Sequence, residues 1–154
     1  MLDLDLPDLR AIEHLVLDFN GTMARDGELL DGLAPRIAGL ANTLAIHVVT
    51  GDTFGRAREA LGRMPCRLHV LAPDQQAQAK LAYVQRLGVA GVACVGNGFN
   101  DRLMMKAVAL GIAVVQAEGA AAATLMAADV IAPTVCDALD LLLHPLRLKA
   151  TLRG

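Results

Sequence analysis

Aromatic residues are scarce in this sequence. It has no Trp, one Tyr and three Phe among 154 residues, although 55% of its residues are hydrophobic. The core must therefore be built from Ala, Val, Leu and Ile, a composition that suits an α/β protein whose strands are covered on both faces. A chain of this length can bury about two-thirds of the surface that its unfolded form exposes, so it needs no covalent or metal staple.

Cysteine, basic charge and long apolar runs are also limited. The sequence has three cysteines, Cys66, Cys94 and Cys136. Their odd number and the lack of a C-x-x-C motif argue against a disulfide framework or a zinc site. The formal net charge is -2 without a basic stripe, so nucleic acid is not an expected partner. The longest apolar stretch, 107–115, is too short to span a bilayer, and the acidic start does not resemble a secretory signal. These absences predict a soluble, cytoplasmic protein without a membrane partner.

Short runs rich in β-branched residues alternate with segments of helical length. The expected strands are 14–18, 45–50, 67–71, 92–95, 112–115 and 129–131, and the expected helices are 32–42, 53–61, 74–87 and 119–128. This alternation predicts a Rossmann-like three-layer α/β sandwich with a mainly parallel sheet. Asp26-Gly27 predicts a small hairpin after the first strand. We expect a single domain over residues 1–154, with its core at about 12–144.

Polar residues follow three of the expected strands. The first strand ends in D-F-N-G-T (18–22), the second in T-G-D (50–52), and the fourth in G-N-G-F-N-D (96–101). Lys80 is the only lysine before Lys106. Ligands of open parallel sheets bind beyond the carboxyl ends of the strands, so these residues predict one site at that edge.

The residue types at this edge suit a phosphate and a metal ion. Asp18 and Asp101, on adjacent loops, would repel each other unless a hard cation lay between them, and Mg2+ with its oxygen ligands is the expected one. Thr50, the amide of Gly51 and the Lys80 ammonium supply hydrogen-bond donors and positive charge for a phosphate beside the metal. Asp18 would then face the phosphorus as a nucleophile.

Each feature alone also has a plain structural interpretation. Asp18 can serve as a turn residue, Thr50 and Asp52 as helix caps, and G-N-G-F-N-D as a strand-to-helix turn. Their common location at one edge favours the joint interpretation as a site.

The order D-x-N-G-T, apolar-T-G, a lone Lys and G-N-G-x-N-D resembles the haloacid dehalogenase (HAD) superfamily of phosphatases and phosphotransferases. Within it, the chain is similar to a group of small soluble proteins that resemble P-type ATPases. The resemblance runs from about Leu15 to the last expected strand. It implies a HAD-like fold, Mg2+ as cofactor, and a phosphorylated small molecule or a phosphoprotein as substrate.

The resemblance also implies roles for individual residues. Asp18 would take the phosphoryl group as an aspartyl-phosphate, and Asp101 would bind Mg2+ with the carbonyl of Asn20. The implied catalytic residues are Asp18, Asn20, Thr50 and Lys80, the phosphate-binding residues are Thr50, Gly51, Lys80 and Asn100, and the metal ligands are Asp18, Asn20, Asn97 and Asp101.

Two asparagines depart from the pattern of phosphatases in this superfamily. Asn20 stands where a second aspartate acts as general acid and base, and an amide cannot exchange protons at useful pH. That loss typically removes ~10²–10⁴-fold in rate. Asn97 replaces a more usual acid, which should weaken Mg2+ binding. The resemblance therefore implies a slow phosphohydrolase that favours acyl or aryl phosphates.

Other interpretations stay open. Asn20 can have a purely structural role in a turn, since Asn-Gly is a common turn dipeptide. A second class of function is a regulatory domain that binds phosphate and Mg2+ without meaningful turnover. A third, the response-regulator receiver, would need its phosphoacceptor after the third strand, where Ala72 and Pro73 stand.

We expect no cap domain, because neither position where this superfamily usually carries one has room for it. Residues 22–50 hold only the hairpin and one helix, and residues 50–80 hold a helix, a strand and the start of the next helix. An open site favours a homo-oligomer in which a neighbouring subunit covers it. On the hairpin, Arg25, Asp26 and Glu28 are expected near a substrate, with solvated turn residues as the alternative.

Overall fold

A six-stranded parallel sheet forms the centre of the protein. The structure is a computed structural model that describes residues 8–52 and 55–154. The strands lie in the order β5-β4-β1-β6-β7-β8. Their bounds are β1 His14–Leu17, β4 Ala45–Thr50, β5 Arg67–Val70, β6 Val92–Gly96, β7 Leu110–Val114 and β8 Val130–Ala132. All neighbouring pairs in this sheet are parallel, as the sequence predicts.

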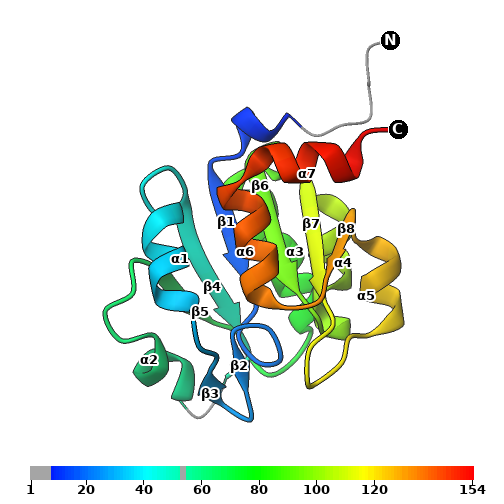
Figure 1. Cartoon of the computed structure of the whole chain (residues 1–154). Coiled ribbons are helices and arrows are strands. Elements are labelled where there is room, and N and C mark those ends of the chain that lie inside the picture. Colours follow the sequence, from blue (N-terminus) through cyan, green and yellow to red (C-terminus); the bar gives the residue numbers. More distant parts are fainter. Residues whose placement is uncertain (1–7, 53–54) are drawn as a thin grey trace.

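The direction in which strands are added reverses beside β1. β4 and β5 lie on one side of it, and β6, β7 and β8 lie on the other (Figure 1). β1 is hydrogen-bonded to both β4 and β6. Such a switch point opens a crevice at the carboxyl ends of the strands, where ligands of α/β sheets bind. The loops after β1 and β6 border this point.

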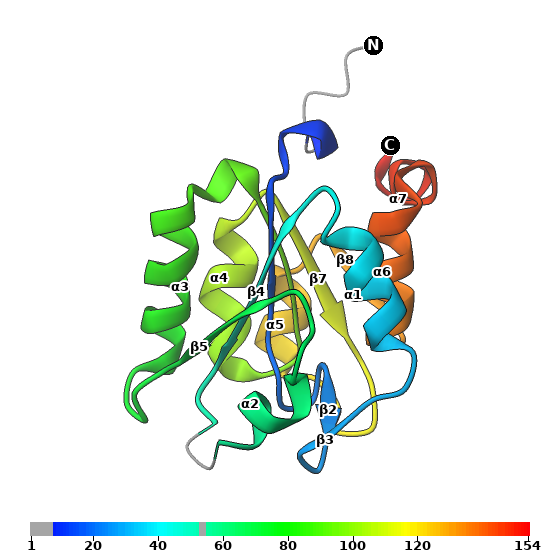
Figure 2. The same ribbon diagram turned by 90° about the vertical axis from the view of Figure 1, so that its left-hand side faces the viewer.

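Helices cover both faces of the sheet (Figures 1 and 2). One face carries α1 Leu33–Leu40 and α6 Val135–Leu143, and the other carries α3 Gln76–Leu87, α4 Arg102–Ala107 and α5 Ala122–Ala127. The short helix α2 Arg56–Leu61 lies near the hairpin, and α7 Pro145–Leu152 follows α6. The side chains of β1 alternate between these faces, since Leu15 and Leu17 belong to one apolar cluster and Val16 to the other.

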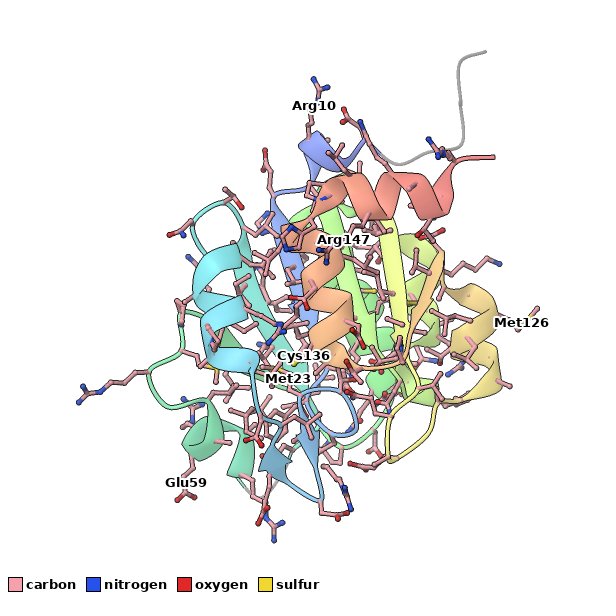
Figure 3. All side chains as sticks on the ribbon, viewed as in Figure 1. Arg10, Met23, Glu59, Met126, Cys136 and Arg147 are labelled. Atoms are coloured by element: carbon pink, nitrogen blue, oxygen red, sulfur yellow. The ribbon has the colours of Figure 1, made fainter. Side chains whose placement is uncertain are left out.

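The expected hairpin is present after β1. It consists of β2 Ala24–Arg25 and β3 Glu28–Leu29, which pair antiparallel. The turn residues Asp26 and Gly27 have φ values of 52° and 81°, the left-handed conformation that a two-residue turn of type I′ requires. At the base of the hairpin, the fully buried Met23 accepts a backbone hydrogen bond of 2.8 Å from Leu30 (Figure 3).

The expected elements agree with the structure apart from their ends. Each of the six strands is present, with ends shifted by at most two residues, and the four expected helices correspond to α1, α2, α3 and α5. The expected start of the second helix, Thr53, lies outside the described residues. The helices α4, α6 and α7 were not expected, nor were the single 3-10 turns η1 Leu9–Ala11, η2 Val89–Gly91 and η3 Phe99–Asp101.

None of the helices in the described part of the chain has both the length and the hydropathy that a membrane span requires.

Candidate active site

Lys80 lies between two carboxylates at the carboxyl edge of the sheet. Its side chain, from α3, is fully buried, and its Nζ is 2.7 Å from Asp18 Oδ1 and 2.7 Å from Asp101 Oδ1. Asp18 directly follows β1, and Asp101 ends η3 after β6. The Lys80 ammonium is therefore shared by the carboxylates of Asp18 and Asp101.

The charges of this cluster depend on one another. Burial disfavours the charged form of Lys80, but the carboxylates of Asp18 and Asp101 outweigh burial and raise the pKa of the ammonium. Burial, and after it the charge of Asp18, raise the pKa of Asp101 to about 6, against the hydrogen bonds from Lys80 and the Gly98 amide. Loss of Lys80 would leave two buried carboxylates without a cation, which is costly.

The loop after β6 wraps around the second oxygen of Asp101. Asp101 Oδ2 accepts hydrogen bonds from the backbone amides of Asn97, at 3.1 Å, and Gly98, at 2.9 Å. A Cβ atom on Gly96 would lie 2.5 Å from the same oxygen. Gly96, the first glycine of G-N-G-F-N-D, is therefore required because the Asp101 carboxylate approaches the backbone at this position. Both carboxylate oxygens of Asp101 are engaged within the protein.

Thr22 connects the nucleophile candidate to the second loop. Its Oγ1 is 3.2 Å from Asp18 Oδ2 and 3.2 Å from Asn97 Oδ1. A hydroxyl has one proton, so these two acceptor oxygens share a single donor. The side chain of Asn97 packs against Gly21, whose φ of 79° and lack of a Cβ leave room for it.

The predicted phosphate-binding residues form a second row beside Lys80. Asn100 Oδ1 is 3.4 Å from Lys80 Nζ, and Asn100 Nδ2 donates to Gln76 Oε1 at 2.9 Å. The amide group of Gln76 contacts Gly51, where a Cβ would collide with it. Thr50 is buried at the end of β4. The structure thus brings Thr50 and Gly51 to the same edge as Lys80, with Gln76 between them.

Two groups of residues that the sequence predicts to act in the site lie at the protein surface. Asn20 is exposed directly after Asp18 and Phe19. The hairpin residues Arg25, Asp26 and Glu28 line a hollow of about 440 Å³. Asp52, the alternative helix cap, accepts a 2.6 Å hydrogen bond from the Ala57 amide in the first turn of α2, although the N-cap residue of this helix is Gly55.

An apolar hollow lies at the opposite edge of the sheet. It measures about 310 Å³ and is lined by residues that precede β1 and β4, such as Ile12 and Leu44, together with residues of α6 and α7. It contains none of the predicted site residues. The chemistry of the carboxyl edge, and not the apolar hollow, therefore marks the candidate active site.

Sequence reasoning missed four residues that shape the site. Thr22 lies within the quoted D-x-N-G-T motif, and Gln76 lies one helical turn before Lys80, a spacing that places both on one helix face. Gln116 and Gly119 belong to the loop after β7, which the same carboxyl-edge rule would have included.

Gln116 joins three segments through its side chain. Its Nε2 donates to the carbonyls of Gly21, at 3.0 Å, and Thr22, at 2.9 Å, while its Oε1 accepts from the Val135 amide at 2.8 Å. The loop after the nucleophile candidate is therefore attached to the start of α6. Within the described residues, no group of three or more His, Cys, Asp or Glu side chains is arranged to hold a metal ion. Any metal here must take oxygen ligands from amides, carbonyls or water as well.

No protein-family model matches the sequence. An uncharacterized protein of Methanocaldococcus jannaschii is 47% identical over 62 residues, which cover 40% of this chain and 67% of that protein.

Solved structures resemble the whole fold. The cobalt-bound deoxy-D-mannose-octulosonate 8-phosphate phosphatase of Haemophilus influenzae has a TM-score of 0.73 at 15% identity, covering 95% of both chains. The Moraxella catarrhalis 3-deoxy-D-manno-octulosonate 8-phosphate phosphatase, in complex with magnesium, phosphate and KDO, has a TM-score of 0.69 at 15% identity, covering 94% of this chain and 95% of the other. A protein of Streptomyces avermitilis assigned to the HAD hydrolase family has a TM-score of 0.70 at 20% identity, covering 89% and 86%. At these identities the similarity establishes the fold.

Proposed function

Because the chain has the HAD hydrolase fold, we propose that it is a Mg2+-dependent phosphohydrolase that forms an aspartyl-phosphate on Asp18. The observation that carries this proposal is the fully buried Lys80 ammonium, 2.7 Å from the carboxylates of both Asp18 and Asp101. A fixed positive charge beside a carboxylate is suited to stabilise a phosphoryl group in transfer. Phosphorylated small molecules are the proposed substrates, since similar structures include phosphatases of an octulosonate 8-phosphate.

The nucleophile is proposed to be Asp18 Oδ1, the oxygen that faces Lys80. A bond forms between Oδ1 and phosphorus while the bond from phosphorus to the leaving-group oxygen breaks. Water then attacks the phosphorus, the Oδ1–P bond breaks, and inorganic phosphate leaves. Thr50, the Gly51 amide and Asn100 would hold the non-reacting phosphoryl oxygens. Two steps of this kind replace one difficult displacement.

The donor set on the other side of Asp18 fits a hard cation. Asp18 Oδ2 and Asn97 Oδ1 share one hydroxyl proton from Thr22, so oxygen lone pairs outnumber donors there. We propose Asp18 Oδ2, Asn97 Oδ1 and the Asn20 carbonyl as ligands for Mg2+, which prefers oxygen. When bound, the ion would neutralise charge on the carboxylate and the phosphoryl group.

Asp101 has a different proposed role from the ligand role that the resemblance implies. Its Oδ1 accepts from Lys80, and its Oδ2 accepts from two backbone amides. Three of its acceptor sites are therefore already used within the protein. Asp101 is therefore proposed chiefly to hold Lys80 and the loop after β6 in place.

The exposed amide of Asn20 leaves the leaving group without a protein acid at that position. Slow turnover and a preference for good leaving groups follow from this proposal, since an amide neither donates a proton to the leaving oxygen nor activates water.

Hydrolysis of an aryl phosphate with and without Mg2+ tests the proposed function. Asp18→Asn should abolish hydrolysis, and Asn20→Asp should accelerate it, by up to ~10²–10⁴-fold. Asp74→Asn, the same substitution at an exposed residue, is the matched control and should retain wild-type rates. Mg2+-dependent activity that survives in Asp18→Asn overturns the mechanism. A panel of phosphorylated metabolites then identifies the substrate class.

A second candidate function is a phosphate- and Mg2+-binding regulatory domain without meaningful turnover. The exposed Asn20 favours it, because no acid at that position completes a catalytic cycle. A single stoichiometric burst of product without sustained release would identify this function. Coverage of the site by a second copy of the chain also stays a hypothesis, which light scattering would test.

A further inference from the structure

The orientation of the Asn97 side chain is fixed by its neighbours. Its Nδ2 donates to the Gly119 carbonyl at 3.0 Å, and its Oδ1 faces Thr22 at 3.2 Å. A carbonyl oxygen only accepts hydrogen bonds, so the opposite orientation would set the Asn97 amide oxygen against the Gly119 oxygen. The backbone of the loop after β7 therefore directs the Asn97 oxygen toward the Thr22 hydroxyl, which also contacts Asp18.

The same contact selects an amide over a carboxylate at position 97. An aspartate there would place a negative oxygen against the Gly119 carbonyl without a proton to share. The loop is held in place on both sides of Gly119, since the Ala121 amide donates to the Asn97 carbonyl at 2.8 Å and Gln116 is bound to the loop after β1. The hydrogen-bonding groups around position 97 therefore favour an asparagine over an aspartate.

The charge available to a metal ion is small as a result. Lys80 lies 2.7 Å from both carboxylates, so its single positive charge leaves the cluster of Asp18, Asp101 and Lys80 with one net negative charge. Mg2+ is commonly held by one or two carboxylates together with substrate phosphates. With a neutral amide at position 97, a bound phosphate must supply the missing charge and an oxygen ligand.

We propose that Asn97, oriented by the Gly119 carbonyl, makes metal binding at this site depend on phosphate, so that each ligand strengthens the binding of the other. This inference rests on the proposed function and concerns the order in which the site fills. Linkage requires the two effects to be equal, so the factor by which phosphate tightens metal binding is the factor by which metal tightens phosphate binding.

Binding of Mn2+ as a probe for the divalent ion measures this dependence without any turnover. The electron paramagnetic resonance signal of free Mn2+ is titrated with the full chain, with and without saturating inorganic phosphate. The wild type should bind Mn2+ about tenfold or more tightly with phosphate present, within the range of coupling between sites. Asn97→Asp should bind Mn2+ about tenfold more tightly than the wild type without phosphate, and its phosphate dependence should shrink.

Asn100→Asp is the matched control because it adds the same charge in the same loop but contacts Lys80 and Gln76 rather than Thr22. It should tighten Mn2+ binding much less than Asn97→Asp does. Equal gains in the two variants would overturn the role of Asn97, and equal Mn2+ affinity of the wild type with and without phosphate would overturn the coupling.

The outcomes separate this inference from the proposed function. If Asp18-dependent hydrolysis is present but phosphate leaves Mn2+ affinity unchanged, only the coupling is wrong. If neither Mn2+ nor phosphate binds, and no hydrolysis occurs, the proposed function is wrong as well.

Discussion

His47 and Tyr83 form a hydrogen bond of 2.7 Å between Nδ1 and the phenol oxygen, beneath the helix that carries Lys80. His47 is 2% exposed, and its Nε2 is 3.1 Å from His14 Nδ1. Burial first, and then the charges of His14 and Arg67, lower the pKa of His47 to about 4. The uncharged imidazole is therefore part of the packing between β4 and α3.

This pKa predicts an acid-sensitive stability. The folded pKa lies below the unfolded value of 6.5, so the unfolded state binds more protons between these limits. The contribution is present above pH 6.5 and is lost as the pH falls toward 4, at up to about 1.4 kcal/mol per pH unit. Denaturant unfolding at several pH values measures it. The loss between pH 7 and 5 should be smaller in His47→Gln, and an identical loss would contradict the assignment to His47.

Removing the Lys80 charge should cost more than removing a surface lysine. Lys80→Met leaves the carboxylates of Asp18 and Asp101 buried without their cation, which destabilises by about 3–5 kcal/mol. Part of this loss should be regained as the pH falls, because protonation then neutralises a carboxylate.

The wild type should lose stability above about pH 10, since the raised pKa of Lys80 makes the folded state retain a proton that the unfolded state releases. Lys106→Met, at an exposed position, is the control for unfolding measurements.

Gly96→Ala should disturb the site more than the core. The new Cβ would lie 2.5 Å from Asp101 Oδ2, so the carboxylate must move away from the backbone amides and Lys80. We expect a loss of about 1–3 kcal/mol in unfolding free energy, and a fall in aryl phosphate hydrolysis. Gly39→Ala, in α1, adds a Cβ at an ordinary 3.4 Å from Leu143 and should be neutral or slightly stabilising. Equal effects of the two substitutions would contradict the close approach at Gly96.

Gln116→Glu tests whether the loop after β7 positions the nucleophile loop. The substitution replaces the Nε2 donor by an oxygen that faces the carbonyls of Gly21 and Thr22. Loss of two hydrogen bonds and the added repulsion should lower kcat/KM on the order of tenfold, equivalent to about 1.4 kcal/mol. Gln85→Glu, at an exposed position on α3, should leave kcat/KM unchanged. A wild-type kcat/KM in Gln116→Glu would show that the loop holds its position without this residue.

The sheet and the edge that carries the site were predictable because both leave regular patterns. Apolar β-branched runs mark buried strands, and the polar residues that follow them must lie at the carboxyl edge of a parallel sheet. Asp18, Lys80 and Asp101 were placed together on this basis. The helix α4 was missed because it is short and begins at Arg102, directly after G-N-G-F-N-D, a sequence with the composition of a turn.

The detailed contacts were not predictable because they depend on which atom meets which. Sequence reasoning placed Lys80 beside a phosphate but did not predict its two contacts with Asp18 and Asp101, because the reach of a long side chain from α3 leaves no pattern in the sequence. The orientation of the Asn97 amide is set by a backbone carbonyl, and a backbone carbonyl has no signature in the sequence. Gln116 likewise acts through backbone groups of distant segments, and its position after the fifth strand does not reveal which carbonyls its amide meets.

The burial of Lys80 makes its amine less reactive than the amines of the other two lysines. Lys106 and Lys149 are exposed and open to reagents that acylate amines, whereas Lys80 is enclosed and held in its protonated, non-nucleophilic form. Acylation of Lys80 therefore requires the structure around the site to open. The extent of its labelling, read by peptide mass, reports opening of the site itself rather than fraying at the surface.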